Sequence, residues 1–312
     1  MGQRHQSFHD GDSVGVGSGQ RLESDRRGVR VSYVRTGGPL SGDGLLGDAI
    51  GVALDPSPVQ SGRAELDANS VLGKVRRILE AFGPEDEHLS LTEITRRSGV
   101  AKASVHRLAQ SMVAWGLLER RGSDYWLGMR LFELGQRVPR QRILRDAARP
   151  YMEDLFRATG EVVHLAVIDG IEILYLEKIS GHGQVTKPSR VAGRMPLHCT
   201  ATGKILLAHS PRRLVEEVLA RPMERRTPYT VVAPGLLLQE LARARELGYA
   251  VEREQTRAGF ISVAIPLIGG AGSVLGALSI TAPTFRADVP RYVDLLKMVG
   301  GRISRSLSTF DD

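Results

Sequence analysis

The segment LTEITRRSGVAKASVHRLAQSMVAWGLLER, residues 91–120, carries the signals of two short helices separated by a turn. Ser90 and Glu93 stand at capping-box spacing, which predicts a helix over about Leu91–Ser98. Gly99 supplies the turn, and a second helix is expected over residues 101–115, although no strong N-cap marks its start. Apolar residues at helical spacing predict the buried side of this second helix: Val105, Leu108, Met112 and Trp115.

The neighbouring segments complete a compact unit. Upstream, residues 70–82 place apolar side chains on one helical face, and Gly83-Pro84 ends that helix. Downstream, LLERR (117–121) and YWLG (125–128) read as two strands of a small hairpin around Gly122-Ser123-Asp124. A helix, a capped helix, a glycine turn, a further helix and a hairpin are the successive elements of a winged helix-turn-helix. This order predicts a unit that binds DNA.

Basic and polar residues gather on the side of this unit that would face DNA. A recognition helix in the major groove reads base edges, and the wing and the preceding helix meet phosphates. The alternative is an ordinary solvated helix face, and the DNA interpretation is favoured because the order of elements coincides with the charge. The residues expected to contact DNA are Thr92, Lys102, Ser104, His106, Arg107, Arg120 and Arg121.

Composition agrees with this interpretation and excludes several other classes. The 312 residues carry a formal net charge of +7, which favours an acidic polymer as partner. A single cysteine excludes an internal disulfide and any zinc site with two thiolates from one chain, and it suits a reducing compartment. Because no apolar run approaches the roughly 20 residues of a membrane helix, we expect a cytoplasmic protein with no membrane partner. No cofactor or metal site is expected.

The chain divides into four expected parts. Residues 1–68 are rich in Gly, Ser, Asp and Arg and predict a disordered extension, residues 69–128 the winged helix-turn-helix, and residues 129–160 linker helices interrupted at Pro139 and Pro150. Residues 161–312 contain two strand pairs, 161–169 with 171–179 and 260–268 with 274–282, with helical segments between and after them. This pattern predicts an α+β domain on a largely antiparallel sheet.

Four collinear segments give the chain a family resemblance. They are LTEITRRSGVAKASVHRLAQSMVAWGLLER, ARPYMEDLFRATGEVVHLAV, GRMPLHCTATGKILLA and GFISVAIPLIGGAGSVLGALSITAP, and together they resemble the IclR family of bacterial transcriptional regulators. The resemblance implies an N-terminal winged helix-turn-helix, a linker helix used in dimerisation and a GAF-like α/β domain that binds a small effector. It further implies homodimers, often paired into dimers of dimers, on palindromic double-stranded DNA operators.

The segment GRMPLHCTATGK, residues 193–204, is the expected wall of the effector pocket. It is not a phosphate-binding loop, because His198 stands where that loop needs glycine and Ile205 follows Lys204 in place of Ser or Thr. A helix that begins here would attract a carboxylate to its free N–H groups, so an organic acid is the expected effector. Matched positions in the family imply these pocket residues: Met195, Leu197, Thr200, Ala201, Thr202, Glu252, Ser262, Ser279 and Thr281.

Two of these positions depart from the family pattern. Relatives that sense small oxo-acids often carry Asp at the position of Glu252 and Cys at the position of Ser262, so the cavity of this chain is expected to differ in shape. Operator affinity is expected to change because the effector binds two arrangements of the dimer with unequal affinity. Pro139 and Pro150 are candidate places for that rearrangement.

Three alternatives remain open at this point. In the first, the second domain is a dimerisation module that binds no ligand. In the second, Cys199 acts as a redox switch. In the third, Cys199 is a catalytic nucleophile activated by His198 or His164. Catalysis is disfavoured because neighbours on an extended segment point in opposite directions, which leaves His198 poorly placed to activate Cys199. No catalytic residue is therefore assigned, and the chain is not expected to be an enzyme.

Overall fold

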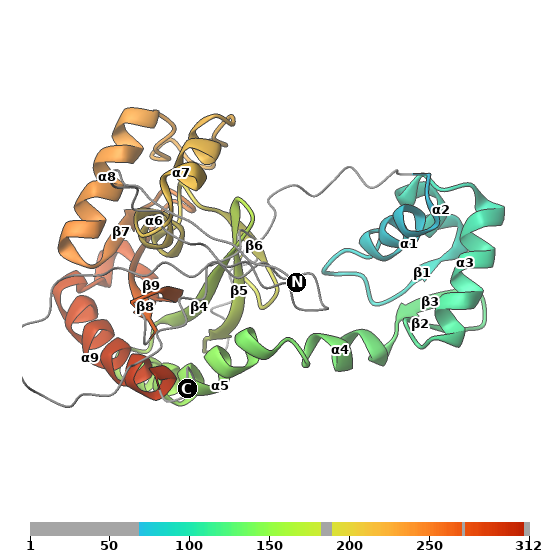
Figure 1. Cartoon of the computed structure of the whole chain (residues 1–312), viewed down its shortest axis with the longest axis horizontal. Helices are drawn as coiled ribbons and strands as arrows, with labels where there is room; N and C mark the ends of the chain where they lie inside the picture. Colours follow the sequence, from blue (N-terminus) through green and yellow to red (C-terminus); the bar gives the residue numbers. More distant parts are fainter. Residues whose placement is uncertain (1–68, 182–188, 270–271, 309–312) are drawn as a thin grey trace, which may run out of the picture. The chain divides into compact units, whose positions relative to one another are not determined.

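The computed structural model describes residues 69–181, 189–269 and 272–308 (Figure 1). The extension predicted over residues 1–68 lies outside the described residues. The helices are α1 Val71–Glu80, α2 Leu91–Ser98, α3 Lys102–Ala114, α4 Met129–Gly135, α5 Pro139–Thr159, α6 Ala201–Ala208, α7 Arg212–Leu219, α8 Pro234–Leu247, α9 Val289–Ser308 and the 3-10 turn Thr284–Arg286. The strands are β1 Leu89–Ser90, β2 Leu118–Arg121, β3 Asp124–Leu127, β4 Val162–Asp169, β5 Glu172–Ile179, β6 Arg194–Pro196, β7 Ala250–Arg253, β8 Phe260–Ile268 and β9 Val274–Pro283.

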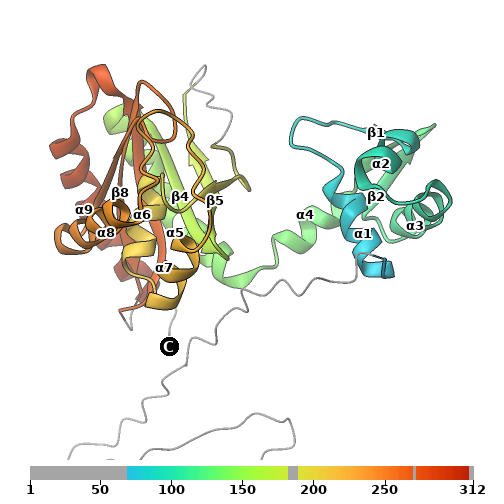
Figure 2. The same ribbon diagram turned by 90° about the horizontal axis from the view of Figure 1, so that it is seen from above.

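Helices α1–α3 and a three-stranded sheet form the first unit, with its own hydrophobic core (Figure 2). Ser90 caps α2 as predicted, since its Oγ accepts the Glu93 N–H at 3.2 Å. Gly99 ends α2 with a φ of 62°, a backbone conformation that glycine adopts without strain. Helix α3 has no side-chain cap, in agreement with the weak start signal in the sequence. The predicted succession of helices and hairpin is confirmed.

Two details of this unit differ from the sequence interpretation. Trp115 was expected to face inward, but α3 ends at Ala114, and the Trp115 side chain is 67% exposed. The left-handed Gly116 that follows turns the chain away before another buried position is reached. Strand β1 was missed, because two residues are too short to show alternation, yet they pair with β3 through Leu89 and Tyr125.

The linker contains α4 and α5, and α5 corrects a second expectation. Pro139 occupies the first turn of α5, where its missing N–H costs no helical bond. Pro150 was expected to interrupt the helix, but α5 continues through it to Thr159. Leu144 and Met152, on either side of this proline, are both buried in one core. Tertiary packing therefore outweighs the local cost of a proline inside a helix.

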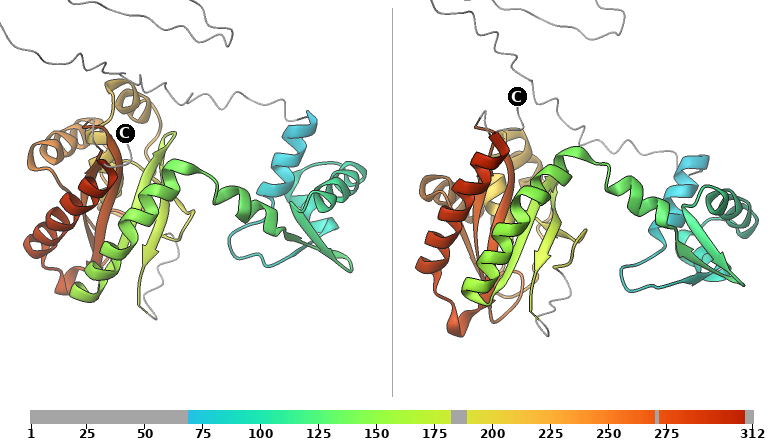
Figure 3. Two further views of the ribbon diagram at one scale, coloured as in Figure 1. Left: turned by 60° about the horizontal axis from the view of Figure 1, so that its bottom comes forward. Right: turned by 90° about the horizontal axis from the view of Figure 1, so that it is seen from below.

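The rest of the chain folds on a six-stranded sheet in the order β6-β5-β4-β9-β8-β7. Every pairing in it is antiparallel, and both predicted hairpins, β4–β5 and β8–β9, are present. Helices α5 and α9 lie side by side across one face of the sheet (Figure 3). Helices α6 and α8 cover the opposite face around a second apolar core. The fold class is confirmed as α+β, with a winged helix-turn-helix and an effector-type domain.

Candidate functional site

The outer face of α3 offers cations that are free of internal partners. Lys102, His106 and Arg107 are exposed, while Val105 and Leu108 on the opposite side enter the core. Ser104 lies half-buried between them. Within the described residues, the side chains of Lys102 and Arg107 make no hydrogen bond or ion pair. Charges in this condition are available to phosphate oxygens or to base edges.

The wing holds its two arginines more tightly. The Arg120 Nε donates to the carbonyl of Gly122 at 3.0 Å, and its guanidinium lies 5.8 Å from the centre of the Tyr125 ring. Arg121 forms an ion pair with Glu119 and lies 5.1 Å from the Trp126 ring. Both side chains are exposed, so the aromatic rings position the guanidinium groups at the surface. Thr92 is exposed on the first turn of α2.

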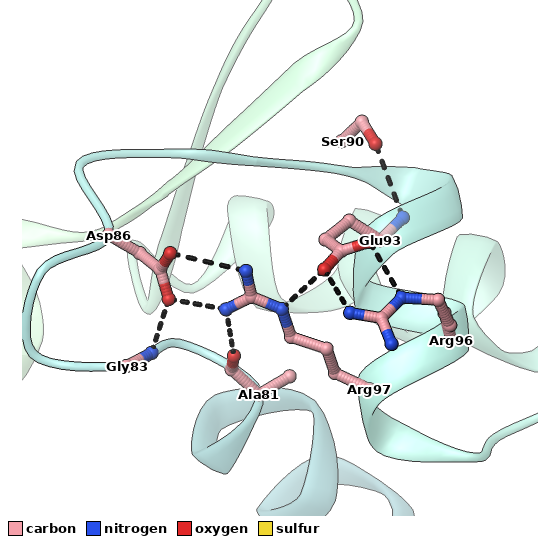
Figure 4. Close-up of polar contacts among 7 residues, drawn as sticks. All are labelled: Ala81, Gly83, Asp86, Ser90, Glu93, Arg96 and Arg97. Carbon is pink, nitrogen blue, oxygen red and sulfur yellow. Dashed lines mark hydrogen bonds and ion pairs between the residues drawn. The ribbon is translucent and has the colours of Figure 1, made fainter.

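A second arginine cluster in this unit serves the fold. Figure 4 shows the Glu93 carboxylate accepting from both Arg96 and Arg97, in place of the return bond to Ser90 that a complete capping box would make. The two arginines hold the pKa of Glu93 down at about 2, Arg96 making the larger contribution. Arg97 also donates to Asp86 and to the carbonyl of Ala81. Arg97 thus ties α2 to the end of α1 and is not a free charge for DNA.

The C-terminal domain encloses a cavity of about 50 Å³ beside the start of α6. By the usual allowance of about 10–15 Å³ per water, it holds roughly three or four waters. Eight of the nine pocket residues expected from the sequence line it: Met195, Thr200, Ala201, Thr202, Glu252, Ser262, Ser279 and Thr281. Leu197 does not; it is buried in the apolar core around α6. Further lining comes from His164, Tyr175, Ser189, Thr256, Arg257 and Phe260.

One wall of the cavity is a hydrogen-bonded row across strands β9, β8 and β7. Thr281 donates to Ser262 at 3.0 Å, and Ser262 donates to the Glu252 carboxylate at 2.8 Å. The other bonds to Glu252 come from the Thr256 hydroxyl and the Gln255 N–H. Burial raises the pKa of Glu252, and these hydrogen bonds oppose that rise. Three protein groups thus hold the Glu252 carboxylate in place.

The opposite wall is the N-terminus of α6, which begins at Ala201. Thr200 is its cap: the hydroxyl accepts the Gly203 N–H at 2.9 Å and donates to the carbonyl of Pro196 at 3.0 Å. The N–H groups of Ala201 and Thr202 have no intrahelical acceptor at this position in a helix. With the positive end of the helix dipole, they make this wall attractive to an anion.

Two buried side chains at the cavity have little hydrogen bonding to the residues that the structure describes. Both ring nitrogens of His164, which is only 3% exposed, lack a hydrogen bond there, and the hydroxyl of Thr202, which is 2% exposed, has the Tyr175 hydroxyl as its one polar partner. Burial, and then Lys178, lowers the pKa of His164 to about 3, so its ring is neutral and offers one donor and one acceptor. Unsatisfied buried polar groups are uncommon and costly, which indicates that a ligand or water completes them.

Arg257 supplies a cation at the same cavity. Its guanidinium lies 4.5 Å from the centre of the Phe260 ring and, within the described residues, makes no ion pair. No periodic signal marks Arg257 or Tyr175 in the sequence, because the position of each depends on which segments the sheet brings together. The place of His164 is easier to infer from the sequence, because it lies on β4 directly opposite Ser279 of β9, a residue that the sequence analysis assigns to the pocket.

Family models match the two halves of the chain. Residues 71–122 match the IclR helix-turn-helix domain, and residues 136–305 match the bacterial transcriptional regulator IclR C-terminal domain. The chain belongs to the IclR family. Its members are transcriptional regulators that bind DNA, and this chain shares that function.

Similar IclR-family proteins cover most of the described chain. The regulator KdgR of Escherichia coli is 34% identical over 78% of this chain and 95% of its own, and XynR of the same organism is 32% identical over 74% and 94%. A solved IclR homologue from Microbacterium hydrocarbonoxydans, in complex with 4-hydroxybenzoate, is 35% identical, covers 77% of this chain and 100% of its own, and has a TM-score of 0.73. The Thermotoga maritima IclR structure is 29% identical over 76% and 98%, with a TM-score of 0.64.

No group of three or more potential metal ligands occurs among the residues described. In the same described part of the chain, none of the helices has the length and apolar character to cross a membrane. His198, one candidate base for Cys199, points its Nε2 at the carbonyl of Glu224, 3.0 Å away.

The single cysteine of the chain provides a direct test of the redox alternative. Cys199 is fully buried, and burial raises the pKa of its thiol to about 12, so the reactive thiolate is scarce at neutral pH. We expect the native protein to leave a thiol reagent such as DTNB almost unconsumed at pH 8, whereas one equivalent reacts promptly in guanidinium chloride. Rapid stoichiometric reaction of the native protein would instead revive the redox switch.

Proposed function

We propose that this IclR-family regulator acts in the cytoplasm as a homodimer, or as a dimer of dimers, on palindromic operators, and that a small carboxylate in the C-terminal cavity sets its operator affinity. In this proposal α3 lies in the major groove, with Lys102, Ser104, His106 and Arg107 toward the bases or their phosphates. Thr92, Arg120 and Arg121 meet the DNA backbone. The unpaired charges of Lys102 and Arg107 support this assignment most directly.

The observation that carries the ligand half of the proposal is the buried His164 ring at the cavity, because neither of its nitrogens has a hydrogen bond to any described residue. A carboxylate placed against the N-terminus of α6 receives donors from Thr202, from the backbone and from the neutral His164 ring. Arg257 adds a cation. The complex of a 35% identical homologue with 4-hydroxybenzoate supports an organic acid as the ligand class. At about 50 Å³ the cavity lies well below the range of about 300–1,000 Å³ that is typical of small-molecule sites, which favours an aliphatic acid of a few carbons.

The ligand acts through a difference in affinity. An effector shifts the equilibrium between two dimer arrangements only as far as it prefers one of them, and operator affinity changes by the same coupling free energy. Such couplings are typically about 1–3 kcal/mol. No chemical step is needed, which agrees with relatives that are regulators and with the absence of any assigned catalytic residue.

The proposal is tested by calorimetry on the full-length protein, combined with operator titrations. Genomic fragments retained by the protein define an operator, and mono- and dicarboxylates of two to four carbons, with 4-hydroxybenzoate for comparison, are titrated with and without it. We expect saturable heat for at least one aliphatic acid and a matching shift in operator affinity. If none of these acids produces heat or a shift, the second domain is a dimerisation module without this ligand class.

Thr202→Val separates a ligand-binding role from a structural one. The change removes a buried hydroxyl whose one polar partner among the described residues is Tyr175, so we expect the stability of the ligand-free protein to change by no more than about 1 kcal/mol. Carboxylate affinity should fall about tenfold, since one charge-assisted hydrogen bond is lost. Thermal unfolding and calorimetry on the same preparation give both numbers. A destabilised variant with unchanged ligand affinity would contradict the assignment.

Arg107→Ala and Arg121→Ala should weaken DNA binding in different ways. If Arg107 reads a base edge, its loss costs about 1–3 kcal/mol on the operator and little on a random duplex. Loss of Arg121 should lower the affinity for both duplexes equally and reduce the salt dependence of binding, because phosphate contacts carry no sequence information. Titrations at several salt concentrations distinguish the two, with Arg76→Ala on the outer face of α1 as control. Equal small losses on both duplexes for Arg107→Ala would remove its base-reading role.

A further inference from the structure

A second hollow of about 330 Å³ lies around strand β7, at the free edge of the sheet. Successive residues of a strand point to opposite faces; Val251 and Arg253 line the hollow from one face, and Ala250 lines it from the face that Glu252 shares with the effector cavity. Its remaining walls come from α8, from the turn at Tyr249 and from Val289 at the start of α9. The volume falls within the range of about 300–1,000 Å³ that is typical of small-molecule sites.

The charges around this hollow are unbalanced. Arg243 and Arg253 are exposed at its rim and form no ion pair with any residue that the structure describes. Lys204 lies at its floor, only 1% exposed, with its Nζ 2.7 Å from a Glu240 carboxylate oxygen. Glu240 is the one acidic residue among the described residues that line it, so three cations face one anion. A hollow with this excess attracts and retains anions.

Lys204 has capacity left for a ligand. An ammonium group carries three donors, and its one hydrogen bond among the described residues goes to the Gln255 side-chain oxygen at 2.7 Å, while Glu240 is its ion-pair partner. Nearby, the Lys297 ammonium lies 5.3 Å from the centre of the Tyr249 ring, which adds positive potential to the same wall. The floor and the rim together suit a ligand with two negative charges, one near Lys204 and one between the two arginines.

Gln255 joins this hollow to the effector cavity. Its backbone N–H donates to Glu252 at 2.9 Å, its side-chain oxygen accepts from Lys204, and its side-chain nitrogen donates to Glu240 at 3.3 Å. Lys204 belongs to α6, the helix whose N-terminus forms a wall of the cavity. The two spaces are therefore separate, but they share one helix and one strand.

We infer that the hollow bounded by Lys204, Arg243 and Arg253 is a second binding site, for a small dianion, distinct from the effector cavity. Phosphate monoesters and dicarboxylates share this chemistry, and the two sources are distinguished by titration. The inference stands on the charges and shape of the hollow, and it holds whether or not the cavity binds a carboxylate.

Calorimetry of the full-length protein with inorganic phosphate and, separately, with succinate tests the inference. We expect saturable binding of at least one probe, weakened tenfold or more by the double change Arg243→Ala and Arg253→Ala, because two charged contacts are removed from exposed side chains that the fold does not require. The tighter of the two probes identifies the class of dianion.

Two control variants test whether the probe binds in the hollow and nowhere else. Arg245→Ala removes an exposed arginine from the same helix, outside the lining, and Thr202→Val alters only the effector cavity. Neither should change the affinity for the probe by more than about twofold. The inference is overturned if neither probe binds saturably at concentrations up to roughly 10 mM, or if the double variant binds as tightly as the parent protein. It is also overturned if Thr202→Val removes the binding, because the anion would then occupy the effector cavity.

Discussion

Gly128→Ala should unfold the winged helix-turn-helix and abolish operator binding. A methyl group on Gly128 would lie 2.0 Å from the carbonyl oxygen of Gly116 and 2.9 Å from the carbonyl carbon of Leu117. Both are backbone atoms at the base of the hairpin, where the Gly128 N–H donates to the Leu117 carbonyl, so no side chain can move to make room. We expect a loss of about 3 kcal/mol or more, at the upper end of overpacking effects.

Tryptophan fluorescence reports on this unit alone, because the only two tryptophans of the chain are Trp115 and Trp126. The thermal transition seen by fluorescence should fall or vanish in Gly128→Ala. Gly135→Ala is the matched control, because a methyl group there meets nothing within 4 Å and alanine favours the helix by up to about 1 kcal/mol. A normal fluorescence transition with full operator affinity in Gly128→Ala would contradict the packing described for the wing.

Gly203→Ala should produce the complementary defect in the effector domain. The added methyl would lie 2.4 Å from the Leu197 carbonyl oxygen and 2.4 Å from the Thr200 hydroxyl, the group that caps α6. The cap must break or the helix must move, and either change displaces the N–H groups of Ala201 and Thr202 from the cavity. We expect about 3 kcal/mol of destabilisation in this domain and loss of carboxylate binding.

Circular dichroism follows this second defect, since most of the described helix and strand lies outside the tryptophan-bearing unit. The fluorescence transition should be unchanged, and the Gly203→Ala protein should still bind its operator while losing the response to effector. Gly235→Ala on α8, where a methyl group meets nothing within 4 Å, should behave as the parent protein. An intact response to effector in Gly203→Ala would exclude the start of α6 as the ligand wall.

Most helices and strands could be predicted from short stretches of sequence, because caps, turns and hairpins are determined by neighbouring residues. The cap at Ser90, the left-handed Gly99 and the two hairpins follow from short-range chemistry, and the structure places them as expected. Pro150 could not be predicted in the same way, since its tolerance inside α5 depends on the buried side chains around it. The domain boundaries drawn at residues 68, 128 and 160 stay predictions.

The candidate cavity was predictable only in part. Family-matched positions on α6, β7, β8 and β9 converge on it, but Leu197 packs into the core because a residue beside a cavity wall can equally point away from it. Tyr175 and Arg257 were missed, since their places depend on strand register and loop path over long separations. The DNA-facing and effector-facing residues remain predictions that the variants above test.

The packing of α5 has a mechanical consequence for signal transfer. Large side chains on both sides of Pro150 are embedded in the sheet core, and exposing even one of them costs about 1.5–3 kcal/mol. Bending at this proline therefore costs about as much as the whole coupling energy that an effector usually supplies. The three non-helical residues before Pro139 lie outside that core, which makes their length and composition the natural place to tune the regulator's response.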